Sequence, residues 1–476
     1  MKVALSAFLN EQTSLLKELI KQLSTVFPYA SVLASDTKGK IFRVRKTGSS
    51  LSDSDWSERG CVARVHNGFN YSEYSFNLLN EGNLPAICDH IKLLANNDLE
   101  KIKTSRIPLN LYPLIHDEPL EESFFTDVAL HPRHISSESK LEKLTNLMNQ
   151  GLAMSEELVD FRVQYEEVQV SKVFISTNKH LAQSYIWTTA ALIPIAVRDG
   201  FMKNTYKEIS GLKGVELIDE LPPLCHPAIH EINQLLRSTK IESGEYDVIC
   251  DPEMSGLIAH EAFGHGVEMD MFVKNRAKAM EYMNKRVASD KVVMYDGARS
   301  ADEVSSYLFD DEGTIGTSTR IINNGILESG ISDLLSSLKL GTVPTGNGKR
   351  ESFERKAYTR MTNTFFAGGK DTLEDMISSI KKGYLLEGFQ SGMEDPKNWG
   401  IQCVVLKGTL IVDGKLTDQI VSPIYMTGYV PDLLESITMV SSDIKLSGGG
   451  ACGKGHKEYV KTSTGGPYIK CRGRLS

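Results

Sequence analysis

Hydrophobic and polar positions near the start of the chain follow a helical pattern. Apolar side chains recur at intervals of three and four among Lys and Gln: Leu15, Leu16, Leu19, Ile20 and Leu23. This spacing places them on one face and predicts a helix over about residues 11–25. Two further helices are predicted over residues 84–96, where Pro85 stands in the first turn, and over residues 136–154.

Between these helices the pattern changes to short runs of β-branched and aromatic residues separated by Gly, Ser, Asp and Asn. Such runs predict a strand meander at residues 30–34, 40–45, 61–66 and 70–76. Residues 107–132 are rich in Pro, His and acidic side chains, which is typical of an extended loop. Residues 160–177 and 182–197 alternate like long strands. The N-terminal half is therefore predicted to mix helices and strands.

The best boundary signal is the segment from Leu221 to Pro227, which holds three prolines in seven residues. Three prolines cannot sit inside one regular element, so a domain boundary is expected between about residues 215 and 245. A short helix is predicted at about residues 230–236. We expect an N-terminal domain over residues 1–230 and a C-terminal domain over residues 231–476.

The pattern of the second half begins with a strand at residues 245–250, after which Asp251 or Pro252 opens a helix that runs through His260. From about Ser289 onward, strands and turns with many glycines are predicted, with one helix at residues 372–382. The expected fold class is α+β: a mixed α/β N-terminal domain followed by a strand-rich C-terminal domain that carries the helix at His260.

Composition narrows the class of protein. The 476 residues are 41% hydrophobic and 24% charged, as in an ordinary folded protein, and the net charge of −8 argues against a nucleic-acid partner. The first residues are too weakly apolar for a signal peptide, and no run of about 18 apolar residues could span a membrane. Seven scattered cysteines fit a reducing cytoplasm: Cys61, Cys88, Cys225, Cys250, Cys403, Cys452 and Cys471.

Candidate chemistry lies in the segment His260-Glu261-Ala-Phe-Gly264-His265. Two imidazoles can hold one zinc ion, and a Glu beside the first can act as base for water. On a regular α-helix, however, residues i and i+5 lie about 140° apart around the axis and do not face one metal. The spacing therefore predicts a helix that is distorted, as by a π-bulge, or that ends at Gly264. The alternative is that the two histidines are paired by accident. The strand and helix-start signals that precede His260 weaken this alternative.

A catalytic zinc takes a third protein ligand, and two candidates stand out. Glu268 lies three residues after His265, so its position favours it as the third ligand. In the alternative, Glu268 is a solvated surface charge without a role in metal binding. Cys452 lies far downstream among glycines, which suit a close approach of the backbone, and its alternative is a small buried thiol. The residues themselves leave this choice open.

Several segments in this order resemble the TldD/PmbA family, the modulators of DNA gyrase that are understood as zinc metallopeptidases. They are the segment 256–270 around the two histidines, Asp310-Asp-Glu-Gly313, Ile321-Ile-Asn-Asn-Gly-Ile-Leu327, Gly346-Asn-Gly348, Arg360-Met-Thr-Asn363 and Cys452-Gly-Lys454. The chain keeps His-Glu-x-x-x-His, so it resembles the catalytic, TldD-like members rather than their partner paralogues. The resemblance implies Zn²⁺ held by His260, His265 and Cys452, with Glu261 as general base.

One departure concerns the residues after Cys452. The family often has Cys-Gly-Lys-x-Gly-Gln, whereas here Lys454 is followed by Gly455 and His456, so this loop is one residue shorter. His456 is then an alternative ligand, a hydrogen-bond donor to the transition state, or a neighbouring polar residue without either role.

The resemblance also implies how the protein works. It predicts a dimer, either with itself or with an inactive paralogue, and an enclosed cleft that cleaves short or unfolded peptides bound in extended form. The main alternative is a non-catalytic regulatory partner of the gyrase-modulator type with a structural or vestigial metal site. A second alternative is a zinc hydrolase that acts on a non-peptide bond.

Two other groups of polar residues have open roles. The acids Asp310, Asp311 and Glu312 could bind a hard cation, but three adjacent acids more often form a solvated turn or meet a basic partner. Arg360 and Asn363 either hold a substrate backbone, brace the site or cap strands. The glycines before Lys454 have the spacing of a phosphate loop, but Gly455 replaces the Ser or Thr that such a loop needs, so nucleotide binding is not expected.

Overall fold

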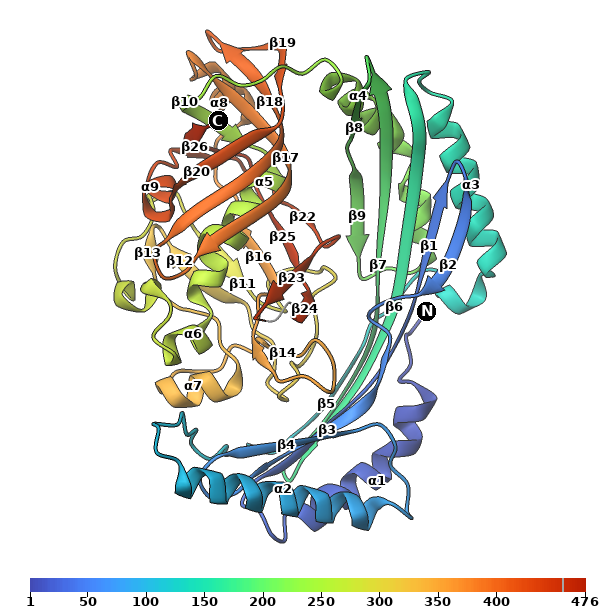
Figure 1. Ribbon diagram of the computed structural model, residues 1–476, viewed down its shortest axis with the longest axis vertical. Coiled ribbons are helices and arrows are strands. Elements are labelled where there is room, and N and C mark those ends of the chain that lie inside the picture. Colours follow the sequence, from blue (N-terminus) through green and yellow to red (C-terminus); the bar gives the residue numbers. More distant parts are fainter. Residues whose placement is uncertain (456–457) are drawn as a thin grey trace.

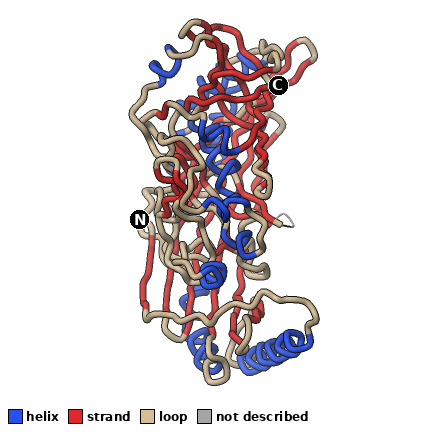
Figure 2. Tube along the Cα trace, turned by 90° about the vertical axis from the view of Figure 1, so that its left-hand side faces the viewer, coloured by secondary structure: helices blue, strands red, loops and turns tan. Residues whose placement is uncertain are grey.

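The computed structural model describes residues 1–455 and 458–476. Figure 1 shows a long curved sheet formed by the first half of the chain, with the second half packed on its concave side. Figure 2, turned by 90°, shows an elongated molecule with the C-terminus near its upper end and helices at its lower end, the place of the first two helices in Figure 1.

The curved sheet has nine strands in the order β4-β3-β1-β6-β7-β5, with β2 paired to β1 and both β8 and β9 paired to β7. Their bounds are β1 (Ala30–Arg45), β2 (Gly48–Asp53), β3 (Glu58–His66), β4 (Tyr71–Phe76), β5 (Leu120–Phe125), β6 (Leu158–Ser176), β7 (Lys179–Arg198), β8 (Phe201–Asn204) and β9 (Lys207–Gly211). Two expectations need correction. The runs 30–34 and 40–45 are one strand, because β6 pairs with β1 without a break from Ser31 to Val44. The expected loop 107–132 contains β5, which pairs in parallel with β7.

Four helices belong to this half: α1 (Ala7–Leu23), α2 (Leu84–Thr104), α3 (Ser137–Leu152) and α4 (Cys225–Leu235). The first three confirm the predicted helices with shifted ends. Ser6 and Ser136 cap α1 and α3 by accepting a backbone N–H, which satisfies a donor that the first turn leaves free. Three short helical turns complete the connections: η1 (Pro132–His134), η2 (Val215–Glu220) and η3 (Pro222–Leu224).

Strand β6 buries both of its faces, because successive side chains of a strand point in opposite directions. Its odd-numbered residues, such as Phe161 and Val173, pack in the cores beneath the helices. Its even-numbered residues, such as Val170 and Phe174, pack against Tyr307, Phe309 and their neighbours in the second half. The sheet is therefore the shared wall of two cores.

The second half contains a sheet that closes on itself, since β10 pairs with both β17 and β26. The ring consists of β10 (Gly244–Cys250), β17 (Lys382–Asp395), β18 (Gly400–Val412), β20 (Ile424–Tyr429) and β26 (Ile469–Leu475), with β19 (Lys415–Val421) and β21 (Met439–Val440) attached. A second sheet has the order β13 (Ile326–Leu327), β12 (Thr319–Asn323), β11 (Met294–Asp296), β16 (Asn363–Phe366), β25 (Ser463–Gly466) and β22 (Lys445–Ser447). Two hairpins complete the strands: β14 (Gly348–Lys349) with β15 (Tyr358–Thr359), and β23 (Ala451–Lys454) with β24 (Glu458–Lys461).

Helices interrupt these strands at α5 (Pro252–Leu257), α6 (Met269–Val273), α7 (Leu334–Leu340), α8 (Leu373–Ser378) and α9 (Val430–Glu435), with a turn η6 (Lys278–Tyr282). The predicted helix at 372–382 is α8, but α7 and α9 make the expectation of one helix wrong. Both are short, so they offer too few positions for a helical period to show. The α+β class, with a strand-rich second half, is confirmed.

The junction between the halves follows α4. Pro227 lies in its first turn, where a missing N–H costs nothing, and Ile229 and Ile232 enter the core beneath α3. The expected division into residues 1–230 and 231–476 stays a prediction. Among the described helices, none is long and apolar enough to cross a membrane.

Candidate metal centre

The helix that carries the histidines changes its winding at the expected place. Asp251 caps α5 by accepting the N–H of Met254 at 2.8 Å. From Ile258 to Gly264 the chain then forms a π-helical segment, η4, followed by the 3-10 turn η5 (His265–Val267). The N–H of His265 binds the carbonyl oxygen of His260, five residues earlier. A π turn returns residue i+5 to the face of residue i, so the predicted distortion is confirmed.

The widened turn brings the two imidazoles together. Their ring centres are 5.2 Å apart and their planes are nearly perpendicular. Gly264 is required next to them, because a Cβ there would lie 2.2 Å from Sδ of Met361. The close packing of Met361 therefore fixes the position of the turn.

Cys452 completes a cluster with the two histidines. One ligand atom from each of His260, His265 and Cys452 lies within 4.8 Å of the others, and Sγ of Cys452 is 3.4 Å from Nε2 of His265. Zinc bonds of about 2.0–2.3 Å separate tetrahedral ligand atoms by about 3.3–3.8 Å. The separations of these three ligand atoms are therefore near those of a zinc site with three protein ligands.

The chemistry of these donors also fits a metal. Burial raises the pKa of the Cys452 thiol, but His260 and His265 outweigh burial and lower this pKa to about 4. Thiolates, not thiols, are metal ligands. Nδ1 of His260 is buried without a hydrogen-bond partner among the described residues. A buried polar atom without a partner is costly, so a ligand at this centre would relieve it.

Glu268 lies behind the cluster rather than in it. Its carboxylate is 3.3 Å from Nδ1 of His265, the nitrogen of the ring that does not approach Cys452. Only 2% of Glu268 is exposed, so it is not a solvated charge. The ammonium of Lys454 holds Glu268 at 2.9 Å and Asp270 at 2.7 Å. A carboxylate on the outer nitrogen of a ligand His fixes the orientation of its ring.

Arg360 braces the strand that carries Cys452. The side chain is 1% exposed and donates to the carbonyl oxygens of Cys452 and Glu458. Of the roles left open for Arg360, bracing the site is the one that these contacts support. Asn363 is fully buried and donates to the carbonyl of Gly297, so it stabilises the second sheet. His456, the other open candidate, lies outside the described residues.

Sequence reasoning missed Glu394, which stands at the end of β17 near this centre. Both of its carboxylate oxygens are buried without a hydrogen-bond partner in the part of the chain that the structure describes. Burial raises the pKa of Glu394 well above its ordinary value, with His265 opposing and Glu261 reinforcing the shift. An acid inside an alternating strand carries no signal that could have identified it.

The acids Asp310, Asp311 and Glu312 are buried, which excludes a solvated turn. Asp311 forms an ion pair with Lys172, and Glu312 lies 2.6 Å from the guanidinium of Arg64. Basic side chains of the curved sheet are therefore the partners of Asp311 and Glu312, and these two acids join the two halves of the molecule. Asp310 instead accepts backbone N–H groups of Glu312, Thr314 and Gly348.

A cavity of about 520 Å³ opens beside the cluster. His260 and Glu261 lie in its wall, and so do residues of α5, β9, β17, β22 and β25. Gly392 is needed to make room for Glu261, since a Cβ at Gly392 would lie 2.6 Å from Cγ of Glu261. The volume falls in the range of about 300–1,000 Å³ that ligand pockets occupy.

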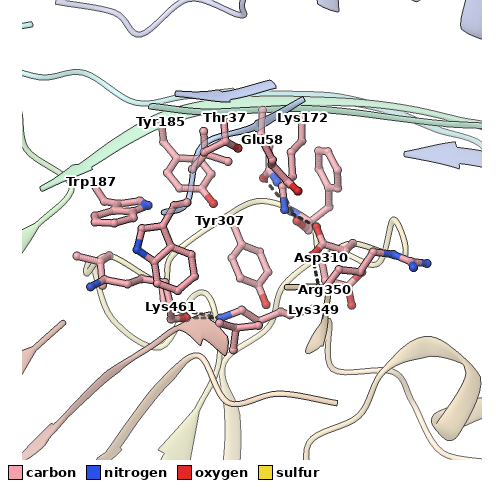
Figure 3. Close-up of a pocket in the computed structure, with 18 of the residues that line it drawn as sticks. Thr37, Glu58, Lys172, Tyr185, Trp187, Tyr307, Asp310, Lys349, Arg350 and Lys461 are labelled. Atoms are coloured by element: carbon pink, nitrogen blue, oxygen red, sulfur yellow. Dashed lines mark hydrogen bonds and ion pairs between the residues drawn. The ribbon is translucent and has the colours of Figure 1, made fainter. Parts of the chain in front are cut away.

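A second cavity lies between the curved sheet and the second half (Figure 3). Tyr185 and Trp187 point into it from β7, and Lys349 and Lys461 line it from the opposite side. Burial lowers the pKa of Lys349 to about 7 and that of Lys461 to about 8. Its volume of about 90 Å³ is below the range of ligand pockets, whereas the volume of the cavity beside Glu261 falls within that range.

Comparisons with known proteins agree with this geometry. Residues 243–474 match the family model described as the PmbA/TldA metallopeptidase C-terminal domain. A protein called zinc metalloprotease TldD homolog from Saccharolobus solfataricus is 28% identical over 342 residues, which cover 71% of this chain and 75% of that protein.

Solved structures share the fold at low sequence identity. A candidate modulator of DNA gyrase from Thermotoga maritima superposes with a TM-score of 0.76 and 17% identity, covering 97% of this chain and 100% of the other. TldE from Thermococcus kodakarensis gives a TM-score of 0.75 and 16% identity, with 96% and 99% covered. Residues 243–474 therefore place the second half of the chain in the TldD/PmbA family, whose C-terminal domain model they match.

Proposed function

We propose that this chain is a zinc-dependent peptidase that cleaves short or unfolded peptides in the cavity beside Glu261. The observation that carries the proposal is the meeting of His260, His265 and Cys452 beside a free carboxylate in the wall of one cavity. The name of the Saccharolobus solfataricus relative, a zinc metalloprotease, supports the metal and the reaction class.

In this mechanism His260, His265 and Cys452 would hold a zinc ion. When bound, zinc would supply a Lewis acid that polarises a carbonyl group and makes water more acidic. Glu261 accepts a proton from the water that attacks the peptide carbonyl and can return it to the leaving amine. The negative charge of the Cys452 thiolate would leave such a centre less positive than three neutral histidines would. The reaction would therefore depend more on Glu261 as the base.

Peptides would bind in extended form. β22 is an edge strand of its sheet and lines the cavity, and an edge strand can pair with an added strand.

The proposal includes a dimer, either with a second copy or with an inactive paralogue. The likeness to TldE is a likeness of fold, and it supports an inactive paralogue as the partner. It also includes a reducing cytoplasm, because Cys452 must remain a free thiolate, and all seven cysteines are free.

The alternative is a regulatory partner of the gyrase-modulator type with a structural metal. A structural site needs no base, and its fourth position is normally closed by protein. Glu261 beside a cavity therefore favours the peptidase. A zinc hydrolase that acts on a non-peptide bond would use the same residues. Only the substrates that it cleaves would distinguish it from the proposed peptidase.

The experiment measures zinc content and hydrolysis of a library of unfolded peptides. Glu261→Gln should keep about one zinc per chain and lose hydrolysis by about 100-fold or more. Cys452→Ser should lose zinc and activity together. The matched control is Glu435→Gln, an exposed acid on α9, which should change neither. Full activity in Glu261→Gln, or a zinc-loaded wild type that cleaves no peptide, would refute the proposal.

A further inference from the structure

The cavity beside Glu261 extends along one face of the helix to a second carboxylate. Glu253, Leu257 and Glu261 are spaced by four residues, and all three lie in the cavity wall. Residues four apart share a helix face. The wall therefore carries the candidate general base near one end and Glu253 near the other.

Apart from the candidate base Glu261, Glu253 is the acid of this wall whose carboxylate has no partner among the described residues. The two oxygens of Asp251 accept N–H groups from Met254 at 2.8 Å and Gly388 at 3.0 Å. Glu208 accepts the hydroxyl of Ser447. Glu253 is half-buried, and its carboxylate forms no hydrogen bond or ion pair within residues 1–455 and 458–476. It lies in the cavity wall, so a cation bound in the cavity can reach it.

Acidic side chains dominate the wall of this cavity. Lys207, the cation that acts on Glu253, lies 2.8 Å from Glu231 and is engaged there. Lys445 also lines the cavity, but it is exposed and forms no ion pair with a described residue. Burial and then the charge of Asp251 raise the pKa of Glu253 to about 8. Four acids therefore line the cavity against one lysine: Glu208, Asp251, Glu253 and Glu261.

We propose that Glu253 selects peptides that carry a positive charge at a fixed distance from the bond that is cleaved. This inference rests on the proposed peptidase function and names its substrate class. Eight residues separate Glu253 from Glu261, which is at most about 12 Å at about 1.5 Å per residue, because the π-helical part from Ile258 onward rises less per residue. An extended peptide advances about 3.3 Å per residue. The charge therefore lies within about four residues of the scissile bond.

A lysine or arginine side chain and a free N-terminal ammonium supply the same chemistry, so the experiment separates them. A peptide that the enzyme cleaves is prepared with lysine at each position within four residues of the cleaved bond. Matched peptides carry acetyl-lysine at the same positions, and a further pair differs only in N-terminal acetylation. A charged hydrogen bond in a partly buried site should raise kcat/KM by about tenfold or more at the matching position.

The variant Glu253→Gln removes the charge and keeps the shape. It should reduce the ratio of kcat/KM for the lysine and acetyl-lysine peptides to near one. The control is Glu245→Gln, an acid of β10 that is 58% exposed and lies 3.6 Å from Arg472 outside this cavity. Glu245→Gln should keep the wild-type ratio. A wild type without preference, or a Glu253→Gln variant with the wild-type ratio, would overturn the assignment.

Binding to Glu261→Gln separates this inference from the proposed function. Fluorescent lysine and acetyl-lysine peptides are titrated onto this variant, and onto Glu261→Gln combined with Glu253→Gln. If no peptide is hydrolysed by the wild type but lysine peptides bind about tenfold more tightly in a Glu253-dependent manner, the peptidase proposal fails and the cation site stands. If peptides are hydrolysed and bound without regard to charge, the cation site fails alone.

Discussion

Gly256 allows the helix with the candidate general base to lie directly on strand β25. A Cβ at this position would stand 2.5 Å from the backbone nitrogen of Gly465 and 2.6 Å from its Cα. Ordinary contacts begin at 3.4 Å, so Gly256→Ala must push α5 away from β25 by about 0.9 Å (3.4 minus 2.5). Both colliding atoms belong to the backbone of β25, so no side-chain rotation can relieve the contact.

The expected cost has two parts with opposite signs. Overpacking a core costs about 1–3 kcal/mol, while replacing a helical Gly by Ala returns about 0.5–1 kcal/mol. A net loss of about 1–2 kcal/mol in the free energy of unfolding should remain. The shift also moves His260 and Glu261 relative to Cys452, which lies on a different element. A displacement of about 1 Å at a reaction centre can cost about 100-fold in rate.

The assay is urea unfolding followed by tryptophan fluorescence, with zinc content and peptide hydrolysis measured on the same preparations. The control is Gly428→Ala on β20, because no described heavy atom lies within 4 Å of a Cβ there. Gly428→Ala should remain within about 0.5 kcal/mol of wild type. If Gly256→Ala unfolds at the wild-type midpoint with full zinc content, the close contact between α5 and β25 does not position the centre.

Three further perturbations test the surroundings of the site. Lys454→Met leaves Glu268 and Asp270 without their shared cation, and it should lower the free energy of unfolding by about 3–5 kcal/mol in urea titrations and reduce zinc content. Arg360→Met removes two donors to the carbonyls that hold the hairpin of Cys452, so competition with a chelator should show zinc affinity reduced about 10–100-fold. Burial raises the pKa of Glu73, but Arg64 and Arg350 outweigh it and hold this pKa below its ordinary value of 4.5. The ionised carboxylate then stabilises the fold fully at pH values above 4.5 and less as the pH falls below that value. The difference in Tm between wild type and Glu73→Gln should therefore narrow in acid.

Local signals in the sequence predicted local structure well. The spacing of His260 and His265 was enough to predict a distorted helix, because the geometry of a regular helix forbids the pair from facing one metal. The cap at Asp251 and the helical faces of α1 and α3 were also visible. The merging of two predicted strands into β1 was not, because only pairing with the distant β6 shows that the strand continues.

Contacts between distant segments carried no local signal. Position favoured Glu268 as the third ligand, and only the family resemblance pointed to Cys452. The burial of Asp311 and Glu312 depends on basic residues of the curved sheet such as Lys172, which lies 139 residues from Asp311. Glu394 is distinguished by burial without a hydrogen-bond partner among the described residues, and Glu253 by its place in the cavity wall. Neither property can be read from a single sequence.

The distance along the chain between the two parts of the candidate centre sets an order of events during synthesis. Cys452 follows His265 by 187 residues, which a ribosome adds in about 10–40 s at about 5–20 residues per second. During that time the nascent chain holds both histidines and Glu261 but no thiolate. Strand β10, which precedes this helix, also waits for β26 to close its ring. If the proposed peptidase is correct, the nascent chain therefore stays inactive until Cys452 has been added and folded against the histidines.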